Sequence, residues 1–313
     1  MEVELEFLAS QSRLPATVVG IGVFDGVHLA HQRLIGHVVT LARELGLPSC
    51  VLTFEPHPQE VLTGRLLPRL ASLDERLERI GALGVDHVKV VRFSRPFSQL
   101  SPEAFVHDVL VGRLGARGVV VGFNFTFGRG GLGTARTLTE LGARSGFTAH
   151  TVDSVAVGGT TVSSSAIRQA LDSGQVEEAA RLLGRPYAVA GVVTTGAGRG
   201  RTIGFPTANL APEPASLKMP SNGVYAAEAT PAGAGAFPAL INIGTRPTFD
   251  GESRTVVPEI YLHGFSGDLV GRGLSVTFLE RLRDEKKFSS VESLVAQIRA
   301  DLAHMLERRK VAP

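Results

Sequence analysis

The sequence predicts an α/β chain of two domains: a doubly wound parallel sheet in the first half and an antiparallel β-barrel with a terminal helix in the second. Three observations predict this fold class. Apolar strands alternate with amphipathic helices over the first half, and short β-rich runs between glycine and proline turns fill the second. The C-terminal segment carries an apolar stripe at helical spacing. With 313 residues, the chain is too long for one ordinary core.

An apolar, β-branched run over residues 18–23 predicts the first buried parallel strand. Phe24 and Gly26 follow it, and His28 and His31 then stand three residues apart as an amphipathic run begins. A helix that follows a strand presents unpaired N–H groups and the positive end of its dipole. The segment therefore indicates a phosphate site.

Further elements continue this alternation. Helices are predicted over residues 34–45, 73–83 and 102–110, and strands over 50–54, 88–93 and 118–122. Ligands of doubly wound sheets bind at the carboxyl ends of the strands. Four polar side chains each follow a predicted strand, so we expect them to converge on one crevice: His28, His31, His57 and Asn124.

Two familiar nucleotide motifs are not supported. The run Gly128–Gly133 matches G-x-G-x-x-G, with Asp153 further on, but Asn124–Phe127 separates the glycines from their strand, which disfavours an NAD site. None of the five lysines follows a glycine. A P-loop is therefore excluded.

Two local patterns keep more than one explanation. Histidines three apart can share a metal, pack in a core or donate to phosphate oxygens, and no third ligand at metal-binding spacing supports the first. In TVSSSAIRQAL, Ser163 or Ser164 can cap the next helix. Alternatively, these hydroxyls and the Arg168 guanidinium face the phosphates of a nucleotide.

A change of texture near Gly184-Arg185-Pro186 predicts domains over residues 1–185 and 186–313. The β-rich runs that follow are YAVAGVVTTG, GVYAAEAT, FPALINIGT, PEIYLHGF and LSVTFLERLR. Such spacing is typical of an antiparallel barrel. A final helix over residues 289–308 should dock its apolar stripe on that barrel.

Within the predicted barrel, GAGRGRTIGFPTANL at Gly196–Leu210 is the most informative stretch. Its glycines and arginines can fold over phosphates or form a mobile connection. Thr207 and Asn209 lie two apart on an extended segment, so they project the same way. A hydroxyl and an amide oxygen suit a hard cation such as Mg²⁺.

Glu259 is a carboxylate among apolar neighbours in VPEIYL. A buried carboxylate is either paired with an arginine or poised as a general base. For this residue the candidate ion-pair partners are Arg246 and Arg283.

Composition limits the class of protein. No run of about eighteen apolar residues could span a bilayer, and the acidic N-terminus lacks the basic region of a signal peptide, so we expect a cytoplasmic protein without a membrane partner. The net charge of +2 gives no reason to expect a nucleic-acid partner. Cys50, the one cysteine, should be a buried structural thiol. We expect a monomer or a weak homo-oligomer.

Four segments of the first half carry a family resemblance: GVFDGVHLAHQ at 22–32, TFEPHP at 53–58, VGFNFTFG at 121–128 and SSSAIR at 163–168. Together they resemble the nucleotidyltransferase-type FMN adenylyltransferase domain of the bacterial bifunctional riboflavin kinase/FAD synthetases. GRTIGFPTAN, NIGTRPTF, GDLVG and FLERLRDEKKF, in the second half, resemble the riboflavin kinase domain of the same family. The resemblance spans nearly the whole chain.

This resemblance implies that the chain phosphorylates riboflavin to FMN and then adenylylates FMN to FAD, with MgATP as the co-substrate of each step. In the kinase half, Thr207 and Asn209 would hold Mg²⁺, and Glu259 would take the proton from the ribityl 5′-hydroxyl. The nucleotide would bind along Gly204, Phe205 and Pro206. Both steps are in-line displacements that depend on positioning and charge neutralisation.

In the adenylyltransferase half, the resemblance implies that His28 and His31 stabilise charge on the transferring group. Ser163, Ser164 and Arg168 would hold the departing pyrophosphate. The remaining residues implied to bind nucleotide, phosphate or flavin are Phe24, Gly26 and Asn124.

Several positions depart from the family pattern. Ala30 stands where glycine is usual, Ser165 where threonine is usual and Asn124 where aspartate is usual. In the kinase half, Tyr261 replaces a usual histidine and Val270 a usual tyrosine, and both changes could reshape the flavin pocket. Alternative hypotheses are therefore a chain in which only the adenylyltransferase site works, a paralogue acting on a modified flavin, and a non-catalytic flavin-binding regulator.

Overall fold

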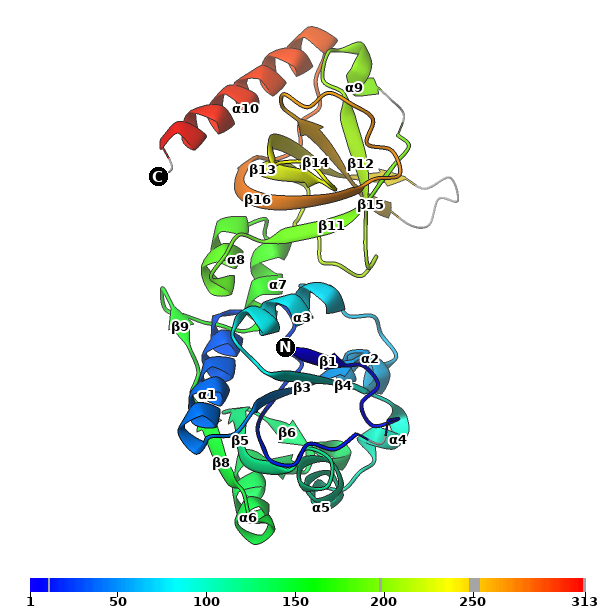
Figure 1. Ribbon diagram of the computed structural model, residues 1–313. Helices are drawn as coiled ribbons and strands as arrows, with labels where there is room; N and C mark the ends of the chain where they lie inside the picture. The colour runs from blue at the N-terminus through cyan, green and yellow to red at the C-terminus, as the bar shows by residue number, and fades with distance from the viewer. Residues whose placement is uncertain (11, 197–198, 248–253, 312–313) are drawn as a thin grey trace. The chain divides into compact units, whose positions relative to one another are not determined.

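The computed structural model describes residues 1–10, 12–196, 199–247 and 254–311. The chain forms two compact units, Met1–Ser164 and Ser165–Pro313 (Figure 1). This division groups α7 (Ser164–Asp172) and α8 (Val176–Leu183) largely with the second unit. The boundary predicted after residue 185 stays a prediction.

The first unit is built on a six-stranded sheet in the order β1-β4-β3-β2-β5-β8. Its strands are β1 (Glu2–Glu4), β2 (Thr17–Ile21), β3 (Ser49–Glu55), β4 (His87–Arg92), β5 (Ala116–Gly122) and β8 (Thr148–Val152). Every neighbouring pair is parallel. Because β2 pairs with β3 on one side and with β5 on the other, the strand order reverses beside β2, which is where such sheets bind ligands.

Helices and short elements connect these strands. They are α1 (Leu29–Leu45), α2 (Pro58–Thr63), α3 (Leu73–Ala82), α4 (Arg95–Ser98), α5 (Pro102–Ala104), the π-helix η1 (Phe105–Val111), the 3₁₀ turn η2 (Arg129–Gly131) and α6 (Ala135–Ser145). Two small hairpins pair β6 (Thr126–Phe127) with β7 (Gly133–Thr134) and β9 (Ala156–Val157) with β10 (Thr160–Thr161). The glycine-rich run at 128–133 lies in η2 and β7, so it is not the strand-to-helix turn of an NAD site.

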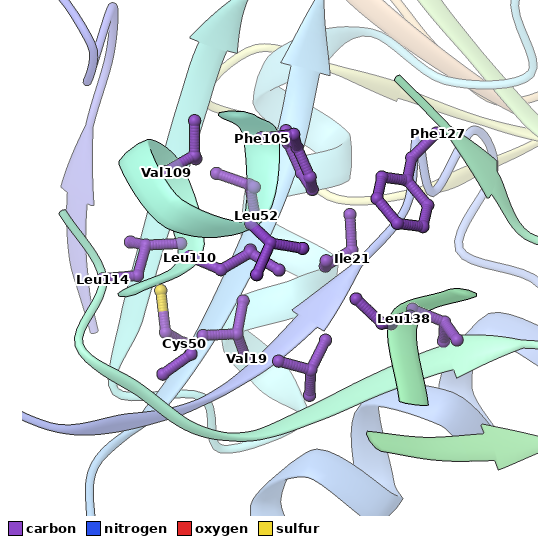
Figure 2. Packing of buried hydrophobic residues seen from close by; sticks show 14 of the residues in the cluster. Val19, Ile21, Cys50, Leu52, Phe105, Val109, Leu110, Leu114, Phe127 and Leu138 are labelled. Carbon is purple, nitrogen blue, oxygen red and sulfur yellow. The ribbon is translucent and has the colours of Figure 1, made fainter. Parts of the chain in front are cut away.

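Each face of the sheet has its own core. Val19 and Ile21 of β2 pack with Cys50, Leu110 and residues of η1, as Figure 2 shows. The alternate residue Val18 packs in the other cluster, with α1 and α3. Because successive residues of one strand are buried on opposite faces, the sheet is covered on both sides, as a doubly wound fold requires.

The second unit is a closed six-stranded barrel in the order β11-β12-β15-β14-β13-β16. Its strands are β11 (Ala188–Thr194), β12 (Thr207–Pro212), β13 (Gly223–Pro231), β14 (Phe237–Pro247), β15 (Arg254–Leu262) and β16 (Gly273–Arg283). All pairs are antiparallel. The short α9 (Arg199–Thr202) precedes β12, and α10 (Val291–Val311) packs on the barrel through Met305 against Ala226 and Leu240.

The predicted fold class is confirmed in both halves, with local differences. The first strand ends at Ile21 rather than at Val23, and the π-helix η1 replaces most of the helix predicted over 102–110. Cys50 is buried as predicted, and burial raises the pKa of its thiol to about 12. No helix within the described ranges has the length and apolar character needed to cross a bilayer.

Candidate active sites

The first site begins with a strained turn at the carboxyl end of β2. Phe24, Gly26 and Val27 have φ values of 55°, 82° and 42°. Left-handed conformations are costly for phenylalanine and more so for a β-branched valine, so the surrounding structure must hold them. The buried Asp25 carboxylate does part of this, because Oδ1 accepts the Leu70 amide at 2.9 Å. Strain of this kind is typical of functional sites.

The histidine pair stands at the start of α1, directly after this turn. His28 is the N-cap, and its Nδ1 accepts the His31 amide at 3.4 Å. The two imidazoles are stacked, with 3.5 Å between ring centroids and an interplanar angle of 15°. The Phe24 ring meets His31 edge to face at 5.2 Å between centroids. The imidazoles therefore lie at a helix N-terminus, as the sequence predicts.

The surroundings of His31 favour its neutral form. Burial, followed by the neighbouring His28 and Arg76, holds the pKa of His31 well below its ordinary value of 6.5. The buried Nδ1 of His31 has no hydrogen-bond partner in the part of the chain that the structure describes. A neutral imidazole with an unpaired nitrogen can donate a hydrogen bond to a ligand or accept one from it. A metal ion shared by the two histidines would lack further ligands, because no cluster of three or more His, Cys, Asp or Glu residues occurs among the described residues.

The other predicted residues of this site lie in different surroundings. Ser164 donates from Oγ to the Asp25 carbonyl at 3.1 Å, so this hydroxyl holds the turn from outside. His57 caps α2, where Nδ1 accepts the Gln59 amide at 3.1 Å. Asn124 is exposed just beyond β5, whereas Ser163 and Arg168 are half-buried.

Phe24 and Gly26 contribute to the turn rather than to an open surface. The Phe24 side chain is 1% exposed, and Gly26 is buried as well. The Phe24 ring folds back over Gly22, where a Cβ would lie 2.8 Å from its Cζ atom. Glycine at 22 therefore leaves the space in which the ring reaches His31.

The second site is a cavity of about 630 Å³ in the barrel unit. Its polar lining includes Thr207, Asn242, Glu259 and Arg283. Its apolar lining includes Val224, Leu240, Tyr261, Phe288, Leu294 and Ile298. Barrel strands and α10 therefore enclose a space of the size typical of small-molecule sites, with a few polar groups on an apolar wall.

Strand register brings the predicted kinase residues together. Glu259 on β15 lies directly opposite Asn209 on one side and Asn242 on the other. Thr207 lies opposite Tyr261. Because paired residues in a ladder project to the same face, Thr207, Asn209 and Glu259 share one face of the barrel wall.

Asn209 is held closely from the loop before α9. It is 6% exposed, and a Cβ on Gly196 would lie 1.9 Å from its Nδ2 atom. The loop that follows α9 folds on itself, with the Phe205 amide donating to the Gly200 carbonyl at 2.8 Å. Gly204, with φ of 83°, makes the turn that this requires. Gly204 and Pro206 are exposed.

The two departures of the kinase half occupy different places. Tyr261 lines the cavity, where its ring meets Phe205 edge to face at 5.2 Å between centroids. Val270 lies in the turn after β15, is 53% exposed and does not line the cavity. Only the change at Tyr261 therefore alters the cavity wall.

One of the two ion-pair partners considered for Glu259 is engaged elsewhere. Arg283 is bound by Asp301 of α10, with Nη2 to Oδ2 at 2.8 Å. The side chain of Arg246 lies outside the described residues, as do Thr248 and Phe249 of the NIGTRPTF motif.

Comparison with known proteins decides the family. The FAD synthetase family model matches residues 10–166, and the riboflavin kinase family model matches residues 183–308. The chain is 39% identical to the bifunctional riboflavin kinase/FMN adenylyltransferase of Bacillus subtilis, over 91% of this chain and 90% of that protein. This chain belongs to the bifunctional riboflavin kinase/FMN adenylyltransferase family.

Other members of the family show similar agreement. The protein from Pseudomonas fluorescens is 38% identical, with 91% of each chain covered. The protein from Escherichia coli K12 is 39% identical, with 93% of this chain and 92% of its own length covered. A crystal structure described as a macrolide-efflux protein from Streptococcus pneumoniae has a TM-score of 0.86 and 32% identity, and the match covers 97% of this chain and 98% of that one. The resemblance drawn from the motifs is thus confirmed.

Two residues of the first site were not predicted from the sequence motifs. Asp25 stands inside GVFDGVHLAHQ, but its carboxylate faces the amides of Leu70 and Ala71. Arg76 of α3 reaches the carbonyl of Val23. Nothing in the local sequence pairs these distant residues.

Proposed function

We propose that this chain makes both flavin cofactors in two successive reactions at two separate sites. Riboflavin and ATP give FMN and ADP in the barrel unit, and FMN and a second ATP give FAD and pyrophosphate in the parallel-sheet unit. One observation carries the proposal furthest. Glu259 stands directly between two amides, Asn209 and Asn242, on the wall of a cavity large enough for a flavin ring.

The donor chemistry of the barrel site fits Mg²⁺. Thr207 and Asn209 offer a hydroxyl and an amide oxygen on one face of the barrel wall. Mg²⁺ prefers such hard oxygen ligands and keeps several waters and phosphate oxygens of its own. When bound, the ion would neutralise charge on the triphosphate of ATP.

In the kinase step, Glu259 would accept the proton of the ribityl 5′-hydroxyl. The hydroxyl oxygen then bonds to the γ-phosphorus, and the bond from that phosphorus to the departing ADP oxygen breaks. The apolar wall around Leu240 and Leu294 would hold the isoalloxazine ring, and Gly204, Phe205 and Pro206 would border the nucleotide. No covalent intermediate with the protein is needed.

In the adenylyl-transfer step, a phosphate oxygen of FMN bonds to the α-phosphorus of ATP, and pyrophosphate leaves. His28, His31 and the N-terminus of α1 would stabilise the charge on the transferring group. Ser163, Ser164 and Arg168 would hold the pyrophosphate, and Asn124 would position flavin or nucleotide. Of these, Ser164 also holds the turn through the Asp25 carbonyl.

The proposed function also implies where one functional domain ends and where in the cell the chain acts. We propose a functional boundary near residue 185, close to residue 183, where the match to the riboflavin kinase family begins. ATP and riboflavin meet in the cytoplasm, where the chain would act as a monomer or a weak homo-oligomer. Ala30 adds only a methyl group relative to glycine, and Tyr261 keeps an aromatic ring on the cavity wall, so we expect both sites to work.

Incubation of the purified chain with riboflavin and MgATP tests this proposal. Chromatography should show FMN first and FAD later, with ADP and pyrophosphate as the by-products. FAD formation from supplied FMN without any FMN formation from riboflavin would favour a chain with only the adenylyltransferase site. Riboflavin binding without turnover would favour a flavin-binding regulator.

A further inference from the structure

A buried arginine from outside the sheet joins the ends of β2 and β3. Arg76, on α3, is 2% exposed. Its Nη1 donates to the Val23 carbonyl at 2.9 Å, and its Nη2 donates to the Phe54 carbonyl at 3.2 Å. Nη2 also contacts the Glu55 carboxylate at 2.8 Å. One guanidinium therefore fixes the last residue before the strained turn to the end of the neighbouring strand.

Arg76 contacts the start of the turn at the Val23 carbonyl. This carbonyl also accepts the Thr53 hydroxyl at 3.1 Å, so two donors from different elements fix its direction. Phe24 follows with φ of 55°, and its ring contacts His31. A rotation of the peptide between Val23 and Phe24 would therefore move the ring that supports the imidazole.

The segment that precedes α3 also binds the same turn. The amides of Leu70 and Ala71 donate to the Asp25 carboxylate at 2.9 Å and 3.3 Å. Because Phe24 and Val27 are costly in the left-handed region, contacts of this kind are what keep the turn populated. α3 and the residues before it are thus the external support of the histidine pair.

Stability is a poor explanation for a guanidinium in this place. The Nε atom of Arg76 is buried and has no hydrogen-bond partner among the described residues. An unpaired buried donor costs stability, and apolar residues of similar volume often serve a core better than a buried ion pair does. Glu55 also keeps a second partner, since Arg69 contacts it at 3.2 Å. The arginine is therefore not needed to neutralise that carboxylate.

We propose that Arg76 is a positioning residue for adenylyl transfer, which holds the Val23–Phe24 peptide and thereby the stacked His28–His31 pair in the geometry that the phosphates require. The inference rests on the proposed function of this unit. Because Arg76 is buried, it would act through the turn and not by contact with a substrate.

The test compares Arg76→Met with a matched substitution on the same helix. Arg79→Met also removes a guanidinium from α3, but Arg79 is more exposed than Arg76 and pairs with Glu75 of the same helix at 2.8 Å. Arg76→Met should lower kcat for FAD formation from FMN by about 10- to 100-fold, with KM for FMN and ATP within about threefold, because misplacement affects the reacting geometry more than binding. Arg79→Met should match the wild type. Arg76→Lys, which can reach a single carbonyl, should recover part of kcat.

Riboflavin phosphorylation by the same chain is the internal control and should stay within about twofold of the wild type in every variant. If Arg76→Met does not fold, Thr53→Val removes the other donor to the Val23 carbonyl and keeps the side-chain shape. It should lower kcat for FAD formation by about 3- to 10-fold. The inference would be overturned if Arg76→Met or Thr53→Val folds and keeps the wild-type kcat. It would also be overturned if a variant loses activity only at temperatures at which it unfolds.

Failure of the proposed function would be recognised separately, since the wild type would then form no FAD. Crystal structures of the wild type and of Arg76→Met decide the inference in that case. A displaced Phe24–Val27 turn and a disrupted imidazole stack would support it. An unchanged turn in the variant would overturn it.

Discussion

Arg283 on β16 and Asp301 on α10 form a two-point ion pair that ties the terminal helix to the barrel. Nε donates to Oδ2 at 3.0 Å and Nη2 donates to the same oxygen at 2.8 Å, while Nε also reaches Oδ1 at 3.2 Å. Gln297 donates to Oδ1 at 2.8 Å. Since Arg283 and Asp301 both line the cavity, this pair fixes the wall that α10 contributes.

Removal of one partner should therefore be costly. Asp301→Ala leaves the guanidinium of Arg283 largely buried without its carboxylate, and we expect a loss of about 3 kcal/mol in the free energy of unfolding of the barrel unit. Urea denaturation measures it. Asp284→Ala, which removes an exposed carboxylate from Arg281, is the matched control and should cost less than about 1 kcal/mol. Equal effects of the two substitutions would show that the pair contributes nothing special.

His31→Ala should stop FAD formation and spare FMN formation. The substitution removes one of two preorganised groups at the N-terminus of α1, so the rate of FAD formation should fall by at least about 100-fold. The measurement is FAD release from supplied FMN and MgATP. His37→Ala, at an exposed position of the same helix, should leave this rate unchanged. A His31→Ala chain that adenylylates FMN at the wild-type rate would remove the imidazole from the mechanism.

Glu259→Gln should have the opposite effect. The amide cannot accept the proton of the 5′-hydroxyl, so riboflavin phosphorylation should fall by about 100-fold or more, while FAD formation from supplied FMN continues. Phosphorylation is followed as FMN by chromatography. Glu213→Gln, at an exposed position just after β12, is the control. Full kinase activity in Glu259→Gln would contradict the assignment of Glu259 as the base.

Gly196→Ala tests the pair of oxygen ligands in the barrel. The added Cβ would lie 1.9 Å from the Asn209 Nδ2 atom, so we expect the Asn209 side chain to turn away from its place beside Thr207. We expect the Mg²⁺ concentration for half-maximal riboflavin phosphorylation to rise by about tenfold or more, as expected when one ligand of a metal site is displaced. Gly235→Ala, where a Cβ meets nothing within 4 Å, should behave as the wild type. An unchanged Mg²⁺ requirement would exclude Asn209 as a ligand.

The pH dependence of stability follows from the depressed pKa of His31. In the unfolded chain His31 takes up a proton near its ordinary pKa of 6.5, whereas in the folded chain burial, His28 and Arg76 keep it neutral to lower pH. The unfolded state then binds more protons, so the free energy of unfolding should fall as the pH drops below 6.5, by up to about 1.4 kcal/mol per pH unit. His31→Gln, which does not titrate, should show a smaller slope in urea denaturation between pH 6.5 and 5. Parallel slopes would show that His31 titrates normally.

Much of the fold could be predicted because its strands are apolar on both faces. Residues 18–21 and 49–54 are buried throughout, and their sequences VVGI and SCVLTF are accordingly mostly apolar. β8, in contrast, lies at the sheet edge and is only half-buried, and TAHTV carries no such signal. The π-helix η1 has the same apolar spacing as an α-helix over this length, so its geometry could not be read from the pattern.

The site could be predicted only where its residues are close in sequence. His28 and His31 are three apart at a helix start, and Thr207 and Asn209 share a face by strand alternation. The position of Glu259 opposite Asn209 depends on which strands pair, and β12 pairs with β15 rather than with its sequence neighbour β13. Arg76 looks like a residue of a polar helix face, and its burial arises only when α3 packs across the ends of β2 and β3.

In the proposed mechanism, one chain carries two independent sites that act in sequence on the same flavin. Complementation between two inactive variants tests it most directly. Neither His31→Ala nor Glu259→Gln alone should make FAD from riboflavin and MgATP, but a mixture should, because FMN released by the first variant is adenylylated by the second. A mixture of the two folded variants that forms no FAD from riboflavin would contradict the claim.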